Sequence, residues 1–225
     1  MNRAIDSVLN QNYPKEKIEV VVVDDGSTDN TPEILKGYGK KIKVVRHKRN
    51  MGLPTACNTG LKNSSGEYII RLDADDTFPS AAIQKMAGAL DKNKEVGFVY
   101  GDYYVINSST KKKRKVSLRK FDIFKMVAAN IMFRRKCFEK IGFYNKKMFF
   151  EEYDILIRIM KKFKGAYVAF SVLNYYRHGK NMTNDKKNWD AGVEQLKKKY
   201  SDLIFPGSKI ATPQYVYKFK FQCGS

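Results

Sequence analysis

Apolar and polar positions alternate in blocks along the first hundred residues. The runs rich in β-branched and aromatic residues are short, which is typical of strands, and the segments between them place apolar residues at helical spacing. The expected strands are 18–23, 42–45 and 68–72, and the expected helices are 3–12, 33–36 and 54–61. Because strands and helices alternate, the sequence predicts an α/β fold with a mostly parallel, doubly wound sheet flanked by helices.

Two of these strands, 18–23 and 68–72, are mainly apolar and run directly into acidic residues, which predicts strands covered on both faces. The acids that follow them are Asp24, Asp25, Asp73, Asp75 and Asp76. Ligands of open α/β sheets bind outside the carboxyl ends of the strands, so parallel strands would bring both acidic groups to one rim. Carboxylates this close repel one another unless a cation lies among them, and Mg²⁺ takes oxygen ligands of this kind. The alternative is ordinary turn and helix-cap chemistry.

The second half of the chain contains a predicted helix whose first turn is acidic. Phe149 and Phe150 lead into Glu151 and Glu152, and the apolar residues that follow keep helical spacing. A carboxylate behind a phenylalanine pair can lie in a partly desolvated cleft and act as a general base. The alternative is a charged first turn that the helix dipole favours. The strands expected in this half are 95–106 and 166–173.

The C-terminal part is basic and predicts one more helix. Trp189, Val193, Leu196 and Tyr200 are spaced for an amphipathic helix flanked by lysines. Such a helix either packs on the domain or lies on a membrane surface. Aromatic residues alternate with lysines in 213–225, which is typical of an edge strand or of the stub of a longer region.

Charge narrows the range of partners. The chain has 225 residues, which fits one domain with a small appendage, and a formal net charge of +20. Such a field attracts nucleic acid, anionic lipid or a phosphorylated substrate. The densest basic run is 111–115, inside a segment expected to be a loop over 111–120. The sequence carries no signature of dedicated nucleic-acid binding, which leaves solvated basic loops or peripheral contact with an anionic membrane.

The length of the apolar runs and the spacing of the cysteines indicate the cellular compartment. No apolar run approaches the roughly 18–20 residues that span a bilayer, and the N-terminus lacks a signal pattern. The expected location is therefore the cytoplasm, including the inner face of the membrane. Cys57, Cys137 and Cys223 match no CxxC metal pattern, which favours a reducing compartment.

Five segments together resemble the family 2 glycosyltransferases, in this order and with this spacing. They are VVVDDGSTDNT from Val21, NMGLPTACNTGL from Asn50, GEYIIRLDADD from Gly66, NIMFRRKCFEKIGFY from Asn130 and EEYDILIR from Glu151. The resemblance covers residue 3 to about residue 183 and implies a GT-A fold. The domain would span 1–183, with a donor half over about 1–106 and an acceptor half over about 107–183, and 184–225 would be a basic extension.

The resemblance also implies an activity. A sugar would pass from a nucleotide-sugar, UDP-linked by expectation, to a hydroxyl of a saccharide or lipid-linked acceptor, with a divalent metal (Mg²⁺ or Mn²⁺) and inversion. Polysaccharide biosynthesis at the cell envelope is the process such enzymes serve. A metal that bridges the diphosphate would stabilise the charge developing on the leaving group.

Site roles follow from the resemblance position by position. Donor contacts are implied for Asp24, Asp25, Asn58 and Asp73. Asp73 and Asp75 match the DxD motif and are the implied metal ligands, with His178 as a third ligand and Arg177 as a phosphate partner. Glu152 matches the expected base, beside Glu151, although the family position carries Asp. His47 has no such context and is expected in an exposed turn.

Two departures from the family pattern matter. Many relatives carry an arginine where this chain has Cys57, which removes one expected donor contact. The family's opening strand is also absent from these residues, and its expected place is between the strands that end at Asp24 and Asp73. Two inner edges would then lack backbone partners, unless the neighbours close up or another segment fills the slot. The absent strand keeps open the alternative of an inactive or donor-binding-only remnant. A nucleotidyltransferase is a second alternative, because it would also use strand-end carboxylates with Mg²⁺.

Overall fold

The computed structural model describes residues 1–179, 181 and 185–200, and its elements follow the predicted alternation. The first half contains α1 Asn2–Leu9, β1 Val21–Asp24, α2 Thr31–Lys36, β2 Lys43–Arg46, α3 Leu53–Asn63, β3 Tyr68–Ile70 and α4 Ala82–Lys92. The second half contains β4 Val96–Asn107, β5 Lys113–Val116, β6 Ile131–Arg134, α5 Arg135–Ile141, α6 Glu151–Met160, β7 Lys164–Arg177 and α7 Lys186–Lys199. The predicted α/β class is confirmed.

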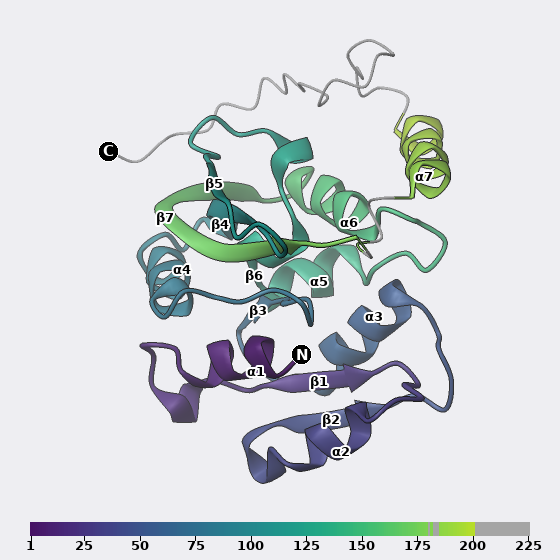
Figure 1. Cartoon of the computed structure of the whole chain (residues 1–225). Coiled ribbons are helices and arrows are strands. Elements are labelled where there is room, and N and C mark those ends of the chain that lie inside the picture. Colours follow the sequence, from purple (N-terminus) through teal and green to yellow (C-terminus); the bar gives the residue numbers. More distant parts are fainter. Residues whose placement is uncertain (180, 182–184, 201–225) are drawn as a thin grey trace.

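The strands form two sheets. β1 and β2 pair in parallel, and a five-stranded sheet has the order β3-β6-β4-β5 with β7 on β4. In the larger sheet β7 is parallel to β4, whereas the other pairs are antiparallel. Figure 1 shows the β1-β2 layer with α2 at the bottom and the larger sheet with α4, α5 and α6 above it.

The edges of β1 and β3 explain one error of the sequence analysis. Among the described residues, β1 pairs with β2 alone and β3 with β6 alone, so each has a strand neighbour on one side. The residues of β3 and most of β1 are accordingly half-buried. The prediction that both strands are fully covered is wrong, because strand burial depends on neighbours that a local apolar run does not reveal.

Helix α1 connects the two layers. Ile5 packs with Leu35 in a small core beside the β1-β2 sheet. Just beyond the helix, Gln11 donates to the carbonyl of Pro79 and accepts from the backbone N–H of Ile83. Helix α1 and the residues after it thus contact both layers.

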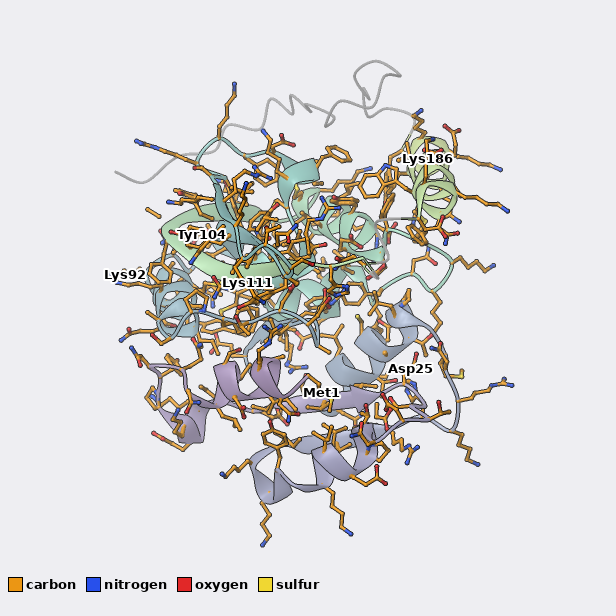
Figure 2. The ribbon with its side chains drawn as sticks, in the orientation of Figure 1. Met1, Asp25, Lys92, Tyr104, Lys111 and Lys186 are labelled. Carbon is orange, nitrogen blue, oxygen red and sulfur yellow. The ribbon has the colours of Figure 1, made fainter. Side chains whose placement is uncertain are left out.

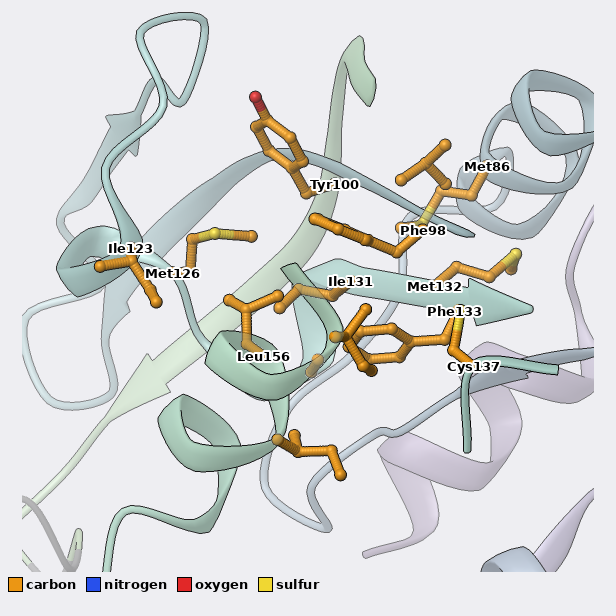
Figure 3. Close-up of a cluster of buried hydrophobic side chains, with 14 of the residues drawn as sticks. Met86, Phe98, Tyr100, Ile123, Met126, Ile131, Met132, Phe133, Cys137 and Leu156 are labelled. Atoms are coloured by element: carbon orange, nitrogen blue, oxygen red, sulfur yellow. The ribbon is translucent and has the colours of Figure 1, made fainter. Parts of the chain in front are cut away.

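The main core lies between the larger sheet and helices α4, α5 and α6. Figure 3 shows Phe98 and Phe133 on neighbouring strands, with Met86 from α4 and Leu156 from α6 packed around them. Phe98 and Met86 are fully buried, and the rings of Phe98 and Phe133 lie 6.0 Å apart. Burial of each such side chain contributes about 1.5–3 kcal/mol. This core fixes the ends of β3 and β6 relative to the start of α6.

Helix α7 packs on the domain, which is the first of the two predicted alternatives. Trp189 lies edge-on to Phe150 with 4.8 Å between ring centroids, and Leu196 is buried. The apolar face of α7 is therefore used inside the protein. No helix in the described part of the chain is long and apolar enough to cross a membrane. The segment 213–225 lies outside the described residues.

The basic segment expected as a loop contains a strand. Residues 113–116 form β5, which pairs with β4 in antiparallel fashion. The ammonium of Lys113 lies 3.7 Å from the centroid of the Tyr104 ring, and Lys115 pairs with Asp102 at 3.0 Å. The loop prediction is wrong here for two reasons. The backbone of 113–116 pairs with β4, and Asp102 balances the charge of Lys115.

Candidate active site at the ends of β1 and β3

A half-buried arginine joins the end of β3 to the start of α6. Arg71 Nε donates to Asp73 Oδ1 at 2.7 Å, and Nη1 donates to Glu151 Oε1 at 2.8 Å. The Arg71 side chain is 17% exposed and that of Glu151 is 2% exposed. The structure therefore brings together two predicted site residues that are far apart in the sequence. Sequence reasoning missed Arg71, although a charge directly after an apolar run needs a partner if it is buried.

The two acids that open α6 differ in their surroundings. Glu151 is committed to Arg71, whereas no other described residue donates a hydrogen bond to the half-buried carboxylate of Glu152. Burial, and then the charge of Glu151, raise the pKa of Glu152 to about 8. A free carboxylate with a pKa near the working pH can accept a proton from a hydroxyl.

Two of the three predicted metal ligands meet beyond the end of β3. His178 Nε2 lies 2.9 Å from Asp75 Oδ2, and both side chains are partly exposed. Asp73, the third, faces Arg71 instead. No cluster of three His, Cys, Asp or Glu residues with metal-binding geometry occurs among the described residues. A carboxylate and an imidazole side by side still fit an ion that completes its coordination with phosphate oxygens.

Asp76 has a structural role beside this pair. Its side chain is buried and accepts from the backbone N–H of Tyr176 at 2.8 Å. Burial raises the pKa of Asp76 to about 8. Thr77 and Asn174 form a further bridge between the same segments. These contacts tie the loop after β3 to the end of β7, which places His178 next to Asp75.

The carboxylates that follow β1 are bonded within the protein. Asp24 is buried, accepts from the backbone N–H of Ser27 at 2.8 Å and pairs with Arg46 at 3.1 Å. Asp25 accepts from the backbone N–H groups of Met51 and Gly52 at 2.8 and 2.9 Å, and Figure 2 shows it at the end of β1. These contacts match the turn alternative, and donor binding by the two carboxylates stays a prediction.

His47 is part of the same arrangement, and its predicted exposed position is wrong. Its side chain is 15% exposed, with Nδ1 2.6 Å from Asp25 Oδ1 and Nε2 2.9 Å from Thr59 Oγ1. Burial opposes ionisation of Asp25, but hydrogen bonds from His47 and from backbone N–H groups outweigh it and lower the pKa of Asp25. The end of β2 lies against α3, which covers the imidazole.

Asn58 in α3 holds the loop before α6. Its Nδ2 donates to the Tyr144 carbonyl, and its Oδ1 accepts from the Tyr144 N–H, both at 2.9 Å. Both polar atoms of the amide are thus bonded to the protein, so the predicted donor contact of Asn58 remains untested. Burial raises the pKa of the neighbouring Cys57 to about 11, so its thiol is unreactive near neutral pH.

A hollow of about 290 Å³ lies between the start of α3 and the start of α6. Pro54 at the start of α3, Lys146, Lys147, Glu151 and Gln195 contribute to its lining. Asp25 holds the residue before α3, and Glu151 is bonded through Arg71 to Asp73. Each strand end is thus connected to an element that lines the hollow, although the acids after β1 and β3 are not themselves part of its lining.

The sequence matches a known protein family and several related proteins. Residues 1–164 match the family Glycosyl transferase family 2. An uncharacterized glycosyltransferase of Rickettsia felis is 33% identical, over 72% of this chain and 29% of its own length. The uncharacterized glycosyltransferase RT0329 of Rickettsia typhi is 31% identical, over 91% of this chain and 70% of its own length. The chain thus spans less than a third of the first of these relatives.

Solved structures show the same fold at low sequence identity. Residues 1–349 of Staphylococcus aureus TarS, in complex with UDP-GlcNAc, superpose with a TM-score of 0.69 at 18% identity, over 87% of this chain and 62% of that one. The mannosyltransferase PcManGT of Pyrobaculum calidifontis, in complex with GDP-Man and Mn²⁺, gives 0.70 at 18% identity, over 92% and 61%. These matches confirm the predicted GT-A fold.

Proposed function

The chain belongs to glycosyl transferase family 2, and from this premise we propose that it transfers a sugar from a nucleotide-sugar to an acceptor hydroxyl. The observation that carries the proposal is the Asp73–Arg71–Glu151 bridge. It holds a carboxylate at the end of β3 close to the first turn of α6, where Glu152 is the free acid. A donor held near Asp73 would meet an acceptor held near Glu152.

The chemical roles follow from these surroundings. Glu152 takes the proton of the acceptor hydroxyl, whose oxygen bonds to the anomeric carbon while the bond to the diphosphate oxygen breaks. Attack from the face opposite the leaving group inverts the configuration. Glu151 is bonded to Arg71 and acts as a positioning residue for its neighbour.

The donor side is assigned to the loop after β3. Asp75 and His178 would hold a divalent ion, with Asp73 close by, and such an ion supplies positive charge to the departing diphosphate. Arg177 is proposed as a phosphate partner, and Asp24, Asp25 and Asn58 as residues that shape the nucleotide side. The nucleotide-sugars in the TarS and PcManGT complexes and the Mn²⁺ of the latter support this assignment.

The domain limits belong to the same proposal. Residues 1–183 form the catalytic domain, with the donor half over about 1–106 and the acceptor half over about 107–183. The basic extension 184–225 begins with α7, whose contacts with Phe150 favour a supporting role for the start of α6. A saccharide or lipid-linked acceptor used in polysaccharide biosynthesis fits the family.

Donor turnover tests the function. Release of nucleoside diphosphate is measured from UDP-GlcNAc and GDP-mannose with Mn²⁺ for the wild type, Asp75→Ala and Glu152→Gln, with the exposed Asp190→Ala as a matched control. We expect metal-dependent release that both site variants lose and the control keeps. Nucleoside triphosphate binding without sugar-nucleotide turnover would favour a nucleotidyltransferase, and sugar-nucleotide binding without turnover a donor-binding remnant.

A further inference from the structure

The hollow beside α6 has basic residues on its rim. Its volume of about 290 Å³ is close to the lower end of small-molecule sites, ~300 Å³. Lys146 and Lys147 lie on one side, Pro54 and Glu151 contribute other parts, and Gln195 comes from α7. Three separate parts of the chain therefore build one site, large enough for a single charged sugar or a group of similar size.

Side chains from other elements fix the loop that carries these lysines. Asn58 bonds both backbone groups of Tyr144, as described above. Arg158 donates to the carbonyl oxygens of Ile141 and Phe143 at 2.8 and 2.7 Å. At the far end Gln195 Oε1 accepts from the Phe149 N–H at 2.9 Å. The loop is thus preorganised, so a ligand that binds the lysines does not have to order the backbone.

The positive charge on the rim is uncompensated within the described part of the chain. Lys146 and Lys147 are exposed and pair with no described carboxylate. Glu151 is the carboxylate in the lining, and its side chain is 2% exposed and pairs with Arg71, which it shares with Asp73. The N-terminus of α3 adds no net charge to the rim, because the Asp25 carboxylate already accepts from the backbone N–H of Gly52, the residue before the helix.

We propose that this hollow binds an anionic group, a phosphate or a carboxylate, carried by the acceptor. The inference rests on the proposed transferase function and adds the class of acceptor. The acceptor is favoured over the donor because Glu151 lines the hollow and is next to Glu152, the proposed base. Asp75 and His178, which are assigned to the donor diphosphate, are not part of the lining of this hollow.

Binding of small sugars provides the test. Glucose, glucose 6-phosphate and glucuronate are titrated calorimetrically into the wild type, the double variant Lys146→Ala/Lys147→Ala and the matched control Lys40→Ala/Lys41→Ala, which removes two exposed lysines elsewhere. We expect the wild type and the control to bind a charged sugar about tenfold more tightly than glucose, as two charge-assisted contacts would provide. The double variant should lose this preference. Whichever charged sugar binds more tightly identifies the group as phosphate or carboxylate.

UDP binding with Mn²⁺ separates the possible outcomes. The double variant should keep the wild-type UDP affinity, which also shows that it is folded. The inference is overturned if the double variant keeps its preference for charged sugars, if the wild type has none, or if UDP binding falls with the lysines. Failure of the transferase proposal has a different signature, because the wild type itself would then bind and turn over no nucleotide-sugar.

Discussion

Replacement of Arg71 by methionine tests the bridge between β3 and α6. Methionine keeps much of the aliphatic volume but removes the charge, so Glu151, 2% exposed, loses its partner. Loss of one member of a buried ion pair costs about 3–5 kcal/mol. The contact with Asp73 is more exposed, at 36%, and adds at most ~0.5 kcal/mol after solvent screening. We therefore expect a loss of about 3–5 kcal/mol from a total of roughly 5–15 kcal/mol.

Urea unfolding at pH 7 measures this loss. The midpoint of the variant should fall by about 1.5–2.5 M for a slope of ~2 kcal/mol/M. Arg119→Met, which removes an exposed arginine, should change stability by less than about 0.5 kcal/mol. A deficit below about 1 kcal/mol would refute the reasoning.

Four further outcomes are expected. Glu152→Gln should lower transfer by about 10²–10⁴-fold while the donor Kd stays unchanged, as measured by steady-state kinetics and calorimetry. Because burial and the charge of Glu151 raise the pKa of Glu152 to about 8, the base is protonated at lower pH, so kcat/KM should rise with pH and level off above about 8. A flat profile would exclude Glu152 as the base. Gly192→Ala places a Cβ 2.7 Å from the Phe150 ring and should cost about 1–3 kcal/mol, seen as a lower Tm. His178→Ala should weaken UDP binding in the presence of Mn²⁺ but not in its absence.

Local patterns were sufficient to predict most elements. The apolar runs before Asp24 and Asp73 are strands, and the acidic turn at Glu151 does begin a helix. The pairing of Asp75 with His178 agrees with the joint occurrence of the family segments. These features depend on residues close in sequence, or on a pattern that recurs across a family.

Features set by distant partners could not be predicted in the same way. Glu151, the partner of Arg71, is 80 residues away, and nothing near either residue reveals the other. The environment of His47 depends on Asp25 and on Thr59 in α3. Coverage of a strand is likewise a property of its neighbours, which is why β1 and β3 are less buried than their composition suggests.

The position of a bound metal tests the central claim most directly. Crystals soaked with UDP and Mn²⁺ would be measured at the manganese absorption edge, so that the anomalous signal locates the ion. The account predicts a peak in contact with the Asp75 carboxylate and the UDP diphosphate, on the side of the Asp73–Arg71–Glu151 bridge that faces Glu152. A bound UDP whose diphosphate and metal lie away from Asp75 would contradict it.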